Sequence, residues 1–233
     1  MDKAANGGLM GLSTFQIKLL ACLFMLIDHI GYFFFPDQMA WRALGRLSFP
    51  LFAFMIANGW YFTHNRKQYF WRIFIFGAVI QIPFSLFVNS SLFNIFFTLS
   101  FGIIAIWLWD KTKKPALRII YCLIPIIAAY LINADYGWFG VSLILACHIF
   151  YDDFPRLSVA FILLSILRIL MGYLGWMLGG DYPTIISLQP FALLSLAFIF
   201  LYDHSPGHKC RWLFFIFYPT HLAILYLIYN FLK

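Results

Sequence analysis

The stretch LFMLIDHIGY, residues 23–32, decides the fold, because it places Asp28 and His29 inside an apolar run from Ile17 to Phe35. A run of this length crosses a bilayer as a helix. With a rise of about 1.5 Å per residue, both polar residues lie roughly 15 to 20 Å from the first apolar turn, well past the headgroups. Ionisable groups at this depth are costly and normally face a bundle interior or a watery cavity, where they mark a functional site.

Neighbouring residues project about 100° apart on a helix, so Asp28 and His29 need not bond each other. Tyr32 is within reach of both and is a candidate substrate contact. Gly31 lacks a side chain, which allows another backbone or a substrate to approach closely.

The composition is that of a polytopic membrane protein. Of the 233 residues, 63% are apolar and only 11% are charged, against about 25% charged in soluble proteins. The 16 basic residues cluster in short connections, which favours a topology signal over nucleic-acid binding. Four scattered cysteines lack CxxC or CxxH spacing, so neither disulfides nor a metal site is predicted.

The chain reads as one domain, residues 1–233, with an all-α fold of about nine transmembrane helices, in a range of eight to ten. The apolar spans are 15–35, 44–62, 70–88, 92–109, 116–132, 136–150, 157–178, 184–202 and 212–231. The first is interpreted as a retained span because it has no clear small-x-small cleavage site.

Basic residues are distributed unequally between the two sets of connections. Twelve of the 16 lie at the N-terminus or after the second, fourth, sixth and eighth spans. The positive-inside rule therefore places the N-terminus in the cytoplasm and, for nine spans, the C-terminus outside. In this topology Asp28, Arg168 and His221 share a layer between mid-membrane and the outer half, where Gln81 also falls.

Asp28 and His29 suit acid–base chemistry, with the imidazole as general base and the carboxylate as its orienter or charge partner. The alternative is a structural ion pair between Asp28 and Arg46. Pro50 is expected to kink the helix 44–62 and free the Arg46 carbonyl. Arg46 itself can stabilise an oxyanion or snorkel to the outer headgroups.

Other polar residues have a functional and a plain interpretation. His221, next to Pro219, is a second proton-transfer group or oxyanion donor, or a neutral histidine satisfied by a neighbouring helix. A basic cluster after the second span suits the phosphates of coenzyme A or anionic lipid; it comprises His64, Arg66, Lys67 and Arg72. Three amide residues are substrate contacts or interhelical packing groups, namely Asn58, Gln81 and Asn94.

Seven segments together resemble the TraX family, and they cover most of the chain. They read LMLIDHIG, GRLSFPLFAF, YFTHN, QIPF, NIFFTLS, ADYGWFG and FYPTHL. The resemblance implies an integral protein of the bacterial inner membrane that acetylates the N-terminus of a conjugative pilin, with acetyl-CoA as donor. Chromosomal relatives are expected to modify other acceptors.

The chain is also loosely similar to the acyltransferase 3 superfamily. That resemblance sets His29 in the first span, an aromatic run from Leu51 to Gly59 in the second, and Arg72 early in the third. It implies that His29 is catalytic and that Arg72 lies near coenzyme A. The arginine that precedes the histidine in that superfamily has no counterpart here, and Lys18 is the nearest basic residue.

These observations predict a membrane-embedded acyltransferase that moves acetyl from acetyl-CoA to an amine or hydroxyl. The acceptor is an unknown protein, glycan or lipid-linked molecule that arrives from the outer side or through the bilayer. His29, Asp28, Arg46 and His221 are its predicted catalytic residues. A small-solute transporter and a non-catalytic membrane scaffold are the alternatives.

Overall fold

The computed structural model describes residues 11–88, 92–180, 187–208 and 212–233, and this part of the chain is helical without a β-strand. Three residues of the topology argument, Lys3, Lys209 and Arg211, lie outside it, as do residues 184–186 of the eighth predicted span. The elements are α1 (Thr14–Phe34), α2 (Met39–Gly45), α3 (Ser48–Phe62), α4 (Arg66–Val88), α5 (Ile95–Lys111), α6 (Pro115–Leu131), α7 (Gly137–Ile149), α8 (Phe154–Met177), η1 (Gln189–Leu194), α10 (Ser195–Phe200) and α11 (Leu213–Leu232).

Helix starts follow local sequence signals. Ser13 and Gln16 form a reciprocal capping box at the start of α1, which satisfies two otherwise unpaired backbone N–H groups. Asn94 caps α5 through the N–H of Phe96. Asp153 caps α8 at the N–H of Arg156. Seven of the predicted spans agree with observed helices to within a few residues, and three of those helices begin at these caps.

Two predicted spans are wrong as continuous helices. The span 44–62 is divided into α2 and α3, with a break at Arg46 and Leu47. Pro50 therefore lies in the first turn of α3, where its missing N–H costs nothing, instead of kinking a longer helix. In the described part of the span 184–202, the 3₁₀ segment η1 precedes the short helix α10.

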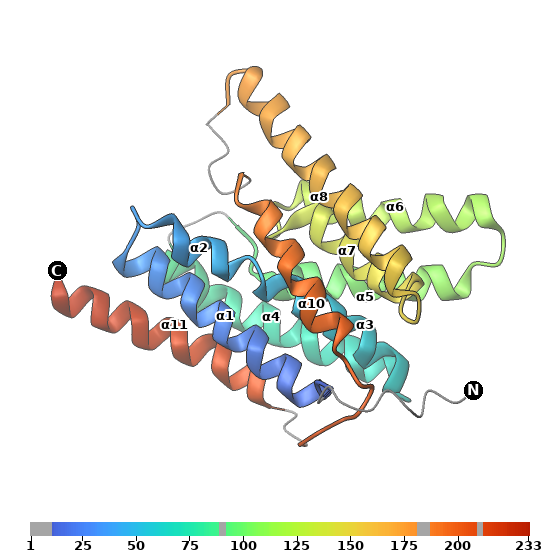
Figure 1. Cartoon of the computed structure of the whole chain (residues 1–233), viewed down its shortest axis with the longest axis horizontal. Coiled ribbons are helices and arrows are strands. Elements are labelled where there is room, and N and C mark those ends of the chain that lie inside the picture. The colour runs from blue at the N-terminus through green and yellow to red at the C-terminus, as the bar shows by residue number, and fades with distance from the viewer. Residues whose placement is uncertain (1–10, 89–91, 181–186, 209–211) are drawn as a thin grey trace.

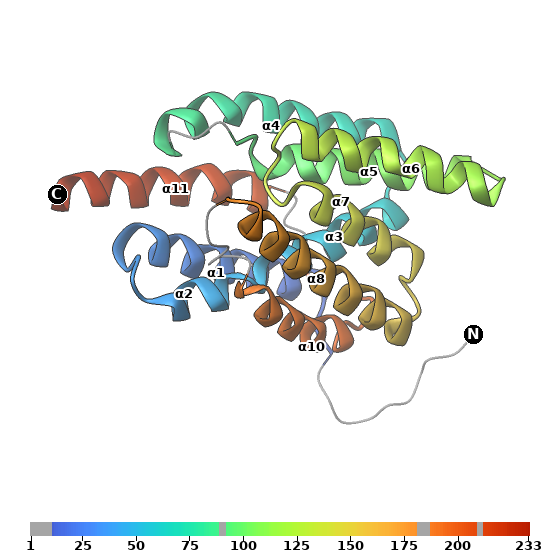
Figure 2. The same ribbon diagram turned by 90° about the horizontal axis from the view of Figure 1, so that it is seen from above.

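The α3 helix forms the centre of the fold. Twelve of its 15 residues are buried, and α1, α5, α7, α10 and η1 all pack against it. Figures 1 and 2 show α1 and α11 side by side and running in the same direction. The loop before α11 is fixed to the start of α1, because Leu12 N–H donates to the Leu201 carbonyl at 2.7 Å and Thr14 N–H to the Ser205 carbonyl at 2.8 Å.

The outer faces of the long helices are apolar. Among the described helices, α1, α8 and α11 are long and apolar enough to cross a membrane. The helices α3, α5 and α7 have 15, 17 and 13 residues, or about 20 to 25 Å at 1.5 Å per residue, which is less than a hydrocarbon core of about 30 Å. The count of nine spans is therefore not confirmed, whereas association with a membrane is supported.

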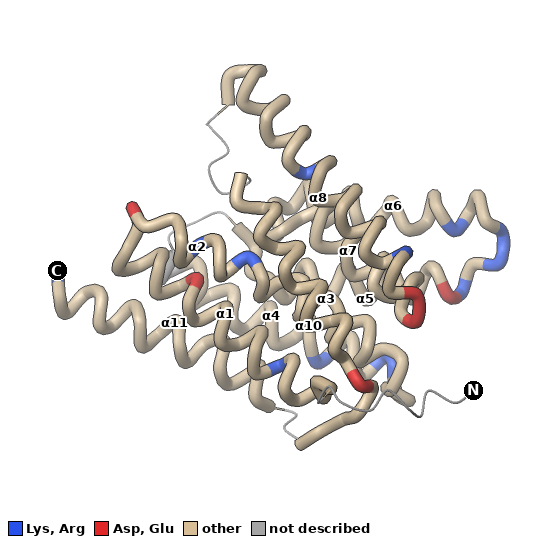
Figure 3. The backbone as a smooth tube through the Cα atoms, in the orientation of Figure 1, with Lys and Arg blue, Asp and Glu red and all other residues tan. Residues whose placement is uncertain are grey.

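Many basic residues gather at one end of the molecule, where acidic residues lie as well. Figure 3 shows the basic residues of the α5–α6 connection at the end where α1 begins, opposite the α1–α2 connection. This separation is what the positive-inside argument requires. Which end faces the cytoplasm stays a prediction.

Candidate functional site: a histidine pair beside an arginine cluster

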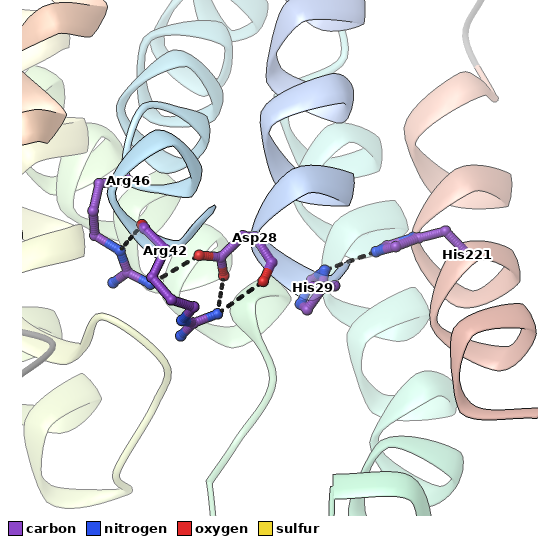
Figure 4. A network of polar contacts seen from close by, with 5 residues as sticks. All are labelled: Asp28, His29, Arg42, Arg46 and His221. Atoms are coloured by element: carbon purple, nitrogen blue, oxygen red, sulfur yellow. Dashed lines mark hydrogen bonds and ion pairs between the residues drawn. The ribbon is translucent and has the colours of Figure 1, made fainter. Parts of the chain in front are cut away.

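His29 of α1 contacts His221 of α11, across 192 positions of sequence. His29 Nδ1 lies 2.9 Å from His221 Nε2, and the two ring centroids are 4.9 Å apart. His221 Nδ1 lies 2.6 Å from the carbonyl oxygen of Phe217, one turn earlier in α11. Figure 4 shows the pair in the space between the two helices.

When both rings are neutral, these contacts determine which ring nitrogens carry the protons. The Phe217 carbonyl only accepts, so His221 must donate from Nδ1, and its Nε2 is then an acceptor. His29 must therefore donate from Nδ1. The remaining nitrogen of His29, Nε2, carries the lone pair and is the proton acceptor of the pair.

Asp28 points away from this pair and binds two arginines. Its Oδ2 lies 2.6 Å from Arg42 Nη1, and its Oδ1 lies 3.3 Å from Arg46 Nη2. Arg42 also donates to the Asp28 carbonyl at 3.2 Å. The ion pair of Asp28 with Arg46, the alternative from the sequence, is thus present, and Figure 4 shows it on the side of α1 opposite His221.

Two glycines allow α2 to pack closely against α1. A Cβ at Gly45 would overlap the Asp28 carboxylate, and a Cβ at Gly31 would overlap the side chain of Trp41. The close approach predicted at Gly31 is made by a neighbouring helix. Arg46, at the C-cap of α2, is only 6% exposed as a result.

Arg42 and Arg46 form an arginine cluster with a third member, Arg168 of α8, which is connected to them through the turn between α6 and α7. The guanidinium groups of Arg46 and Arg168 lie 5.8 and 5.3 Å from the ring centroid of Tyr136. Arg168 also donates to the Tyr136 carbonyl at 3.3 Å. Burial raises the pKa of Asp135 in the same turn, and the charges of Arg46 and Arg168 partly oppose this shift. Arg168 therefore joins the predicted polar layer.

A cavity of about 420 Å³ lies nearer the start of α1. Its walls are mostly apolar and aromatic side chains of α3, α4, α5 and α11, and Lys18 and Arg72 also line it. Of the predicted cofactor residues, Arg72 alone lines this cavity. His64 and Lys67 are exposed, and Arg66 stacks on Trp60 at 4.5 Å from the ring centroid.

Asn58 also lines the cavity and is the centre of a hydrogen-bond network. Its Oδ1 accepts from the hydroxyl groups of Tyr151 and Tyr202, and its Nδ2 donates to Thr14 Oγ1 at 3.5 Å. Asn58 is 3% exposed. It ties α1, α3 and the segment after α7 together at the base of the cavity.

Gln81 and Asn94 bind each other, which favours their packing interpretation. Gln81 Oε1 accepts from the backbone and side-chain nitrogens of Asn94, both at 2.9 Å, and Asn94 donates to the Gly77 carbonyl at 2.8 Å. Tyr32 is 49% exposed, and its ring centroid lies 5.6 Å from the Arg42 guanidinium.

Sequence reasoning missed two features of this region. Arg42 lies in a predicted connection between two spans and has no role among the predicted site residues, although its ion pair is the shorter one to Asp28. His148, which is not among the predicted site residues, contacts Asp110 at 2.8 Å, and Asp110 accepts from Trp60 Nε1 at 2.9 Å. Helical spacing contains no signal for either contact, because the partners lie on different helices.

The fold and site define a helical membrane-type protein with a pair of hydrogen-bonded histidines and a buried arginine cluster. The TraX protein family model matches residues 13–229, and this chain belongs to that family. It is 26% identical over 234 residues to the "Probable fimbrial assembly protein FimC, serogroup H1" of Dichelobacter nodosus, covering 91% of this chain and 94% of that protein.

A second relative matches a shorter part of the chain. The "Uncharacterized protein RP591" of Rickettsia prowazekii (strain Madrid E) is 38% identical over 66 residues, which cover 28% of this chain and 25% of that protein. No solved structure matches this chain. Membership of the TraX family therefore rests on the family model.

Proposed function

We propose that this protein is a membrane-embedded acyltransferase that acetylates an amine or hydroxyl of a protein, glycan or lipid-linked acceptor, with acetyl-CoA as donor. The observation that carries the proposal is the histidine pair, in which His29 Nε2 is the nitrogen left to accept a proton. The name of the Dichelobacter nodosus relative links the family to fimbrial assembly, so a pilus subunit is the first acceptor to test.

In this mechanism His29 is the general base and His221 is a positioning residue. His29 Nε2 takes the proton of the acceptor amine as the nitrogen attacks the thioester carbonyl carbon. The C–N bond forms, the C–S bond breaks, and the proton passes from His29 to the departing thiolate. His221 keeps the Nδ1 proton of His29 in place, as a carboxylate does in a catalytic triad.

The apolar cavity with Lys18 and Arg72 suits the pantetheine arm and a phosphate of coenzyme A. Lys18 and His29 are eleven residues apart on α1, or about 16 Å along the helix at 1.5 Å per residue. The donor must therefore extend along the seam between α1 and α11 to bring its thioester to His29. Arg46 binds Asp28 on the side of α1 opposite His221, so this geometry does not support the oxyanion role predicted for Arg46.

The decisive assay follows thiol release and acceptor mass, using purified protein, acetyl-CoA and a pilus subunit. We expect His29→Ala to lower kcat by about 10²- to 10⁴-fold. His221→Leu should lower it as well, and His221→Gln should restore part of it, because the Gln oxygen can accept the His29 proton. His208→Ala, in the loop before α11, is the matched control and should retain wild-type activity.

Arg72→Gln tests the donor site separately. We expect this variant to raise the KM for acetyl-CoA while kcat is largely kept. If the wild type releases no thiol with any acceptor, the transferase proposal fails.

A non-catalytic role in pilus assembly is the second candidate, favoured by the name of the Dichelobacter nodosus relative alone. An assembly factor would support piliation in cells equally well as wild type and as His29→Ala. Loss of piliation in His29→Ala, with the protein present at normal level, would favour the enzyme.

A further inference from the structure

Several buried hydrogen-bond donors beside the arginine cluster have no protein acceptor within the described residues. They are Arg168 Nε, Ser165 Oγ and Gln189 Nε2. Ser165 and Arg168 are three residues apart on α8 and share a face, and Gln189 begins η1, which packs against α2 and α8. Ser165 and Gln189 are 2% and 1% exposed. Unpaired buried donors are rare in folded proteins and call for an explanation.

The charges of the same region do not balance. Arg42 and Arg46 share the single carboxylate of Asp28. Arg168 forms no ion pair within 4.0 Å in the described part of the chain. With Asp135 counted as ionised, three arginines face two aspartates, which leaves one positive charge in excess. An uncompensated charge in a buried site is strongly unfavourable.

The backbone beside Arg168 is held in an uncommon conformation. Tyr136 has a φ of 62°, which is a genuine outlier for a bulky side chain. Its ring stacks on Phe49 with centroids 3.9 Å apart, and its carbonyl accepts from Arg168. Strain of this kind persists where surrounding structure enforces it, and it is common at ligand clamps. Tyr136 positions Arg46 and Arg168 on one aromatic ring.

We propose that Arg46, Arg168 and Gln189 form a binding site for an oxyanion, specifically a phosphate group. A phosphate supplies several acceptor oxygens and a negative charge, which are the two things that this region lacks. The planar guanidinium groups match its geometry. The phosphate is either a free anion or part of an amphiphile that enters between helices from the bilayer.

The apolar surroundings favour entry from the membrane. On α8, Leu163, Leu167 and Leu170 are 60%, 46% and 59% exposed, and they form an apolar outer face that is turned away from Arg168. An amphiphile would keep its chain in the surrounding bilayer and pass its phosphate between neighbouring helices to Arg168. Binding of this kind does not depend on the proposed acetyl transfer, so it is measured without acetyl-CoA.

The test uses the full chain in a neutral maltoside detergent, with thermal unfolding followed against increasing probe concentration. The probes are sodium phosphate and dodecyl phosphate, each compared with sodium chloride at equal ionic strength. A ligand that binds the folded state raises the apparent unfolding temperature in a saturable way and yields a dissociation constant. We expect wild type to bind one or both probes.

Arg168→Gln removes the excess charge and should weaken phosphate binding about tenfold or more. Arg156→Gln is the matched control on the same helix, because Arg156 is 74% exposed and pairs with Asp153; it should bind as wild type does. Gln189→Leu removes a buried unpaired donor and should weaken binding while leaving the probe-free unfolding temperature unchanged or higher.

Stabilisation by dodecyl phosphate alone identifies an amphiphile, and stabilisation by both probes identifies the free anion. The proposal is overturned if neither probe stabilises wild type beyond chloride. It is also overturned if Arg168→Gln binds with wild-type affinity, including the case in which that variant only lowers the probe-free unfolding temperature.

Discussion

Replacing Asp28 with asparagine tests whether this carboxylate holds α1 and α2 together. The substitution keeps the shape of the side chain, which matters because Gly45 packs directly against it. It removes the charge that Arg42 contacts at 2.6 Å and Arg46 at 3.3 Å. Both arginines then share a buried region without their carboxylate.

The structure gives the expected size of the effect. The side chains of Asp28, Arg42 and Arg46 are 15%, 15% and 7% exposed, so the pairs are largely shielded from water. Breaking a buried pair by removing one partner costs roughly 3 to 5 kcal/mol, and we expect the lower end here, about 3 kcal/mol, because Asp28 and Arg42 keep some exposure. For a chain of this size that is a fall of about 6 to 12 °C in the apparent Tm.

The assay is thermal unfolding of detergent-purified Asp28→Asn beside Asp153→Asn. Asp153 pairs with Arg156 at 3.2 Å, but their side chains are 39% and 74% exposed, so its loss should cost about 1 kcal/mol or less. A double-mutant cycle with Arg42→Gln should give a coupling energy of about 0.5 to 3 kcal/mol. Equal shifts for Asp28→Asn and Asp153→Asn would refute the reasoning.

Two further substitutions examine the interior. Burial raises the pKa of Asp135 above its usual range, although the charges of Arg46 and Arg168 oppose this shift. Because the pKa is raised in the folded state, the stability that Asp135 contributes is present at low pH. It is lost as the pH rises through the folded-state pKa. The Tm of Asp135→Asn relative to that of wild type should therefore increase as the pH rises from about 4 to about 7. A constant Tm difference across that range would contradict the raised pKa of Asp135. Gly102→Ala should cost about 1 to 3 kcal/mol by overpacking, because its methyl group would meet Ile144 Cδ1 at 2.5 Å. Ile144→Ala in the same chain should make the double variant less destabilised than the sum of the single variants, and strict additivity would count against that contact.

The apolar runs predict where most helices lie. Local signals, such as the caps at Ser13, Asn94 and Asp153, fix where some of these helices begin. The break between α2 and α3 could not be predicted, because it depends on a tertiary contact. Gly45 and Arg46 end α2 where they meet Asp28 of another helix. The kink predicted at Pro50 is absent for the same reason. The helix α2 ends at Gly45, before Pro50, and Pro50 lies in the first turn of the next helix, α3.

The sequence predicts the membrane depth of the site residues, but not which of these residues contact each other. Counting residues from the membrane surface puts Asp28 and His221 in one layer, and both belong to the observed site. Counting does not reveal which face of α1 meets α11. Asp28 was therefore expected to orient His29, whereas the hydrogen bond to His29 comes from His221.

There is a physical reason why His221, and not Asp28, is the hydrogen-bond partner of His29. If Asp28 oriented His29, Arg42 and Arg46 would lose their carboxylate, and two buried positive charges would be uncompensated. A second carboxylate for His29 would add another charge within a region where ionised groups are costly. His221 avoids both costs, because a neutral imidazole anchored to the Phe217 carbonyl accepts the His29 proton without carrying charge. Adjacent residues of α1 therefore serve separate tasks, with Asp28 compensating charge and His29 left free to accept a proton.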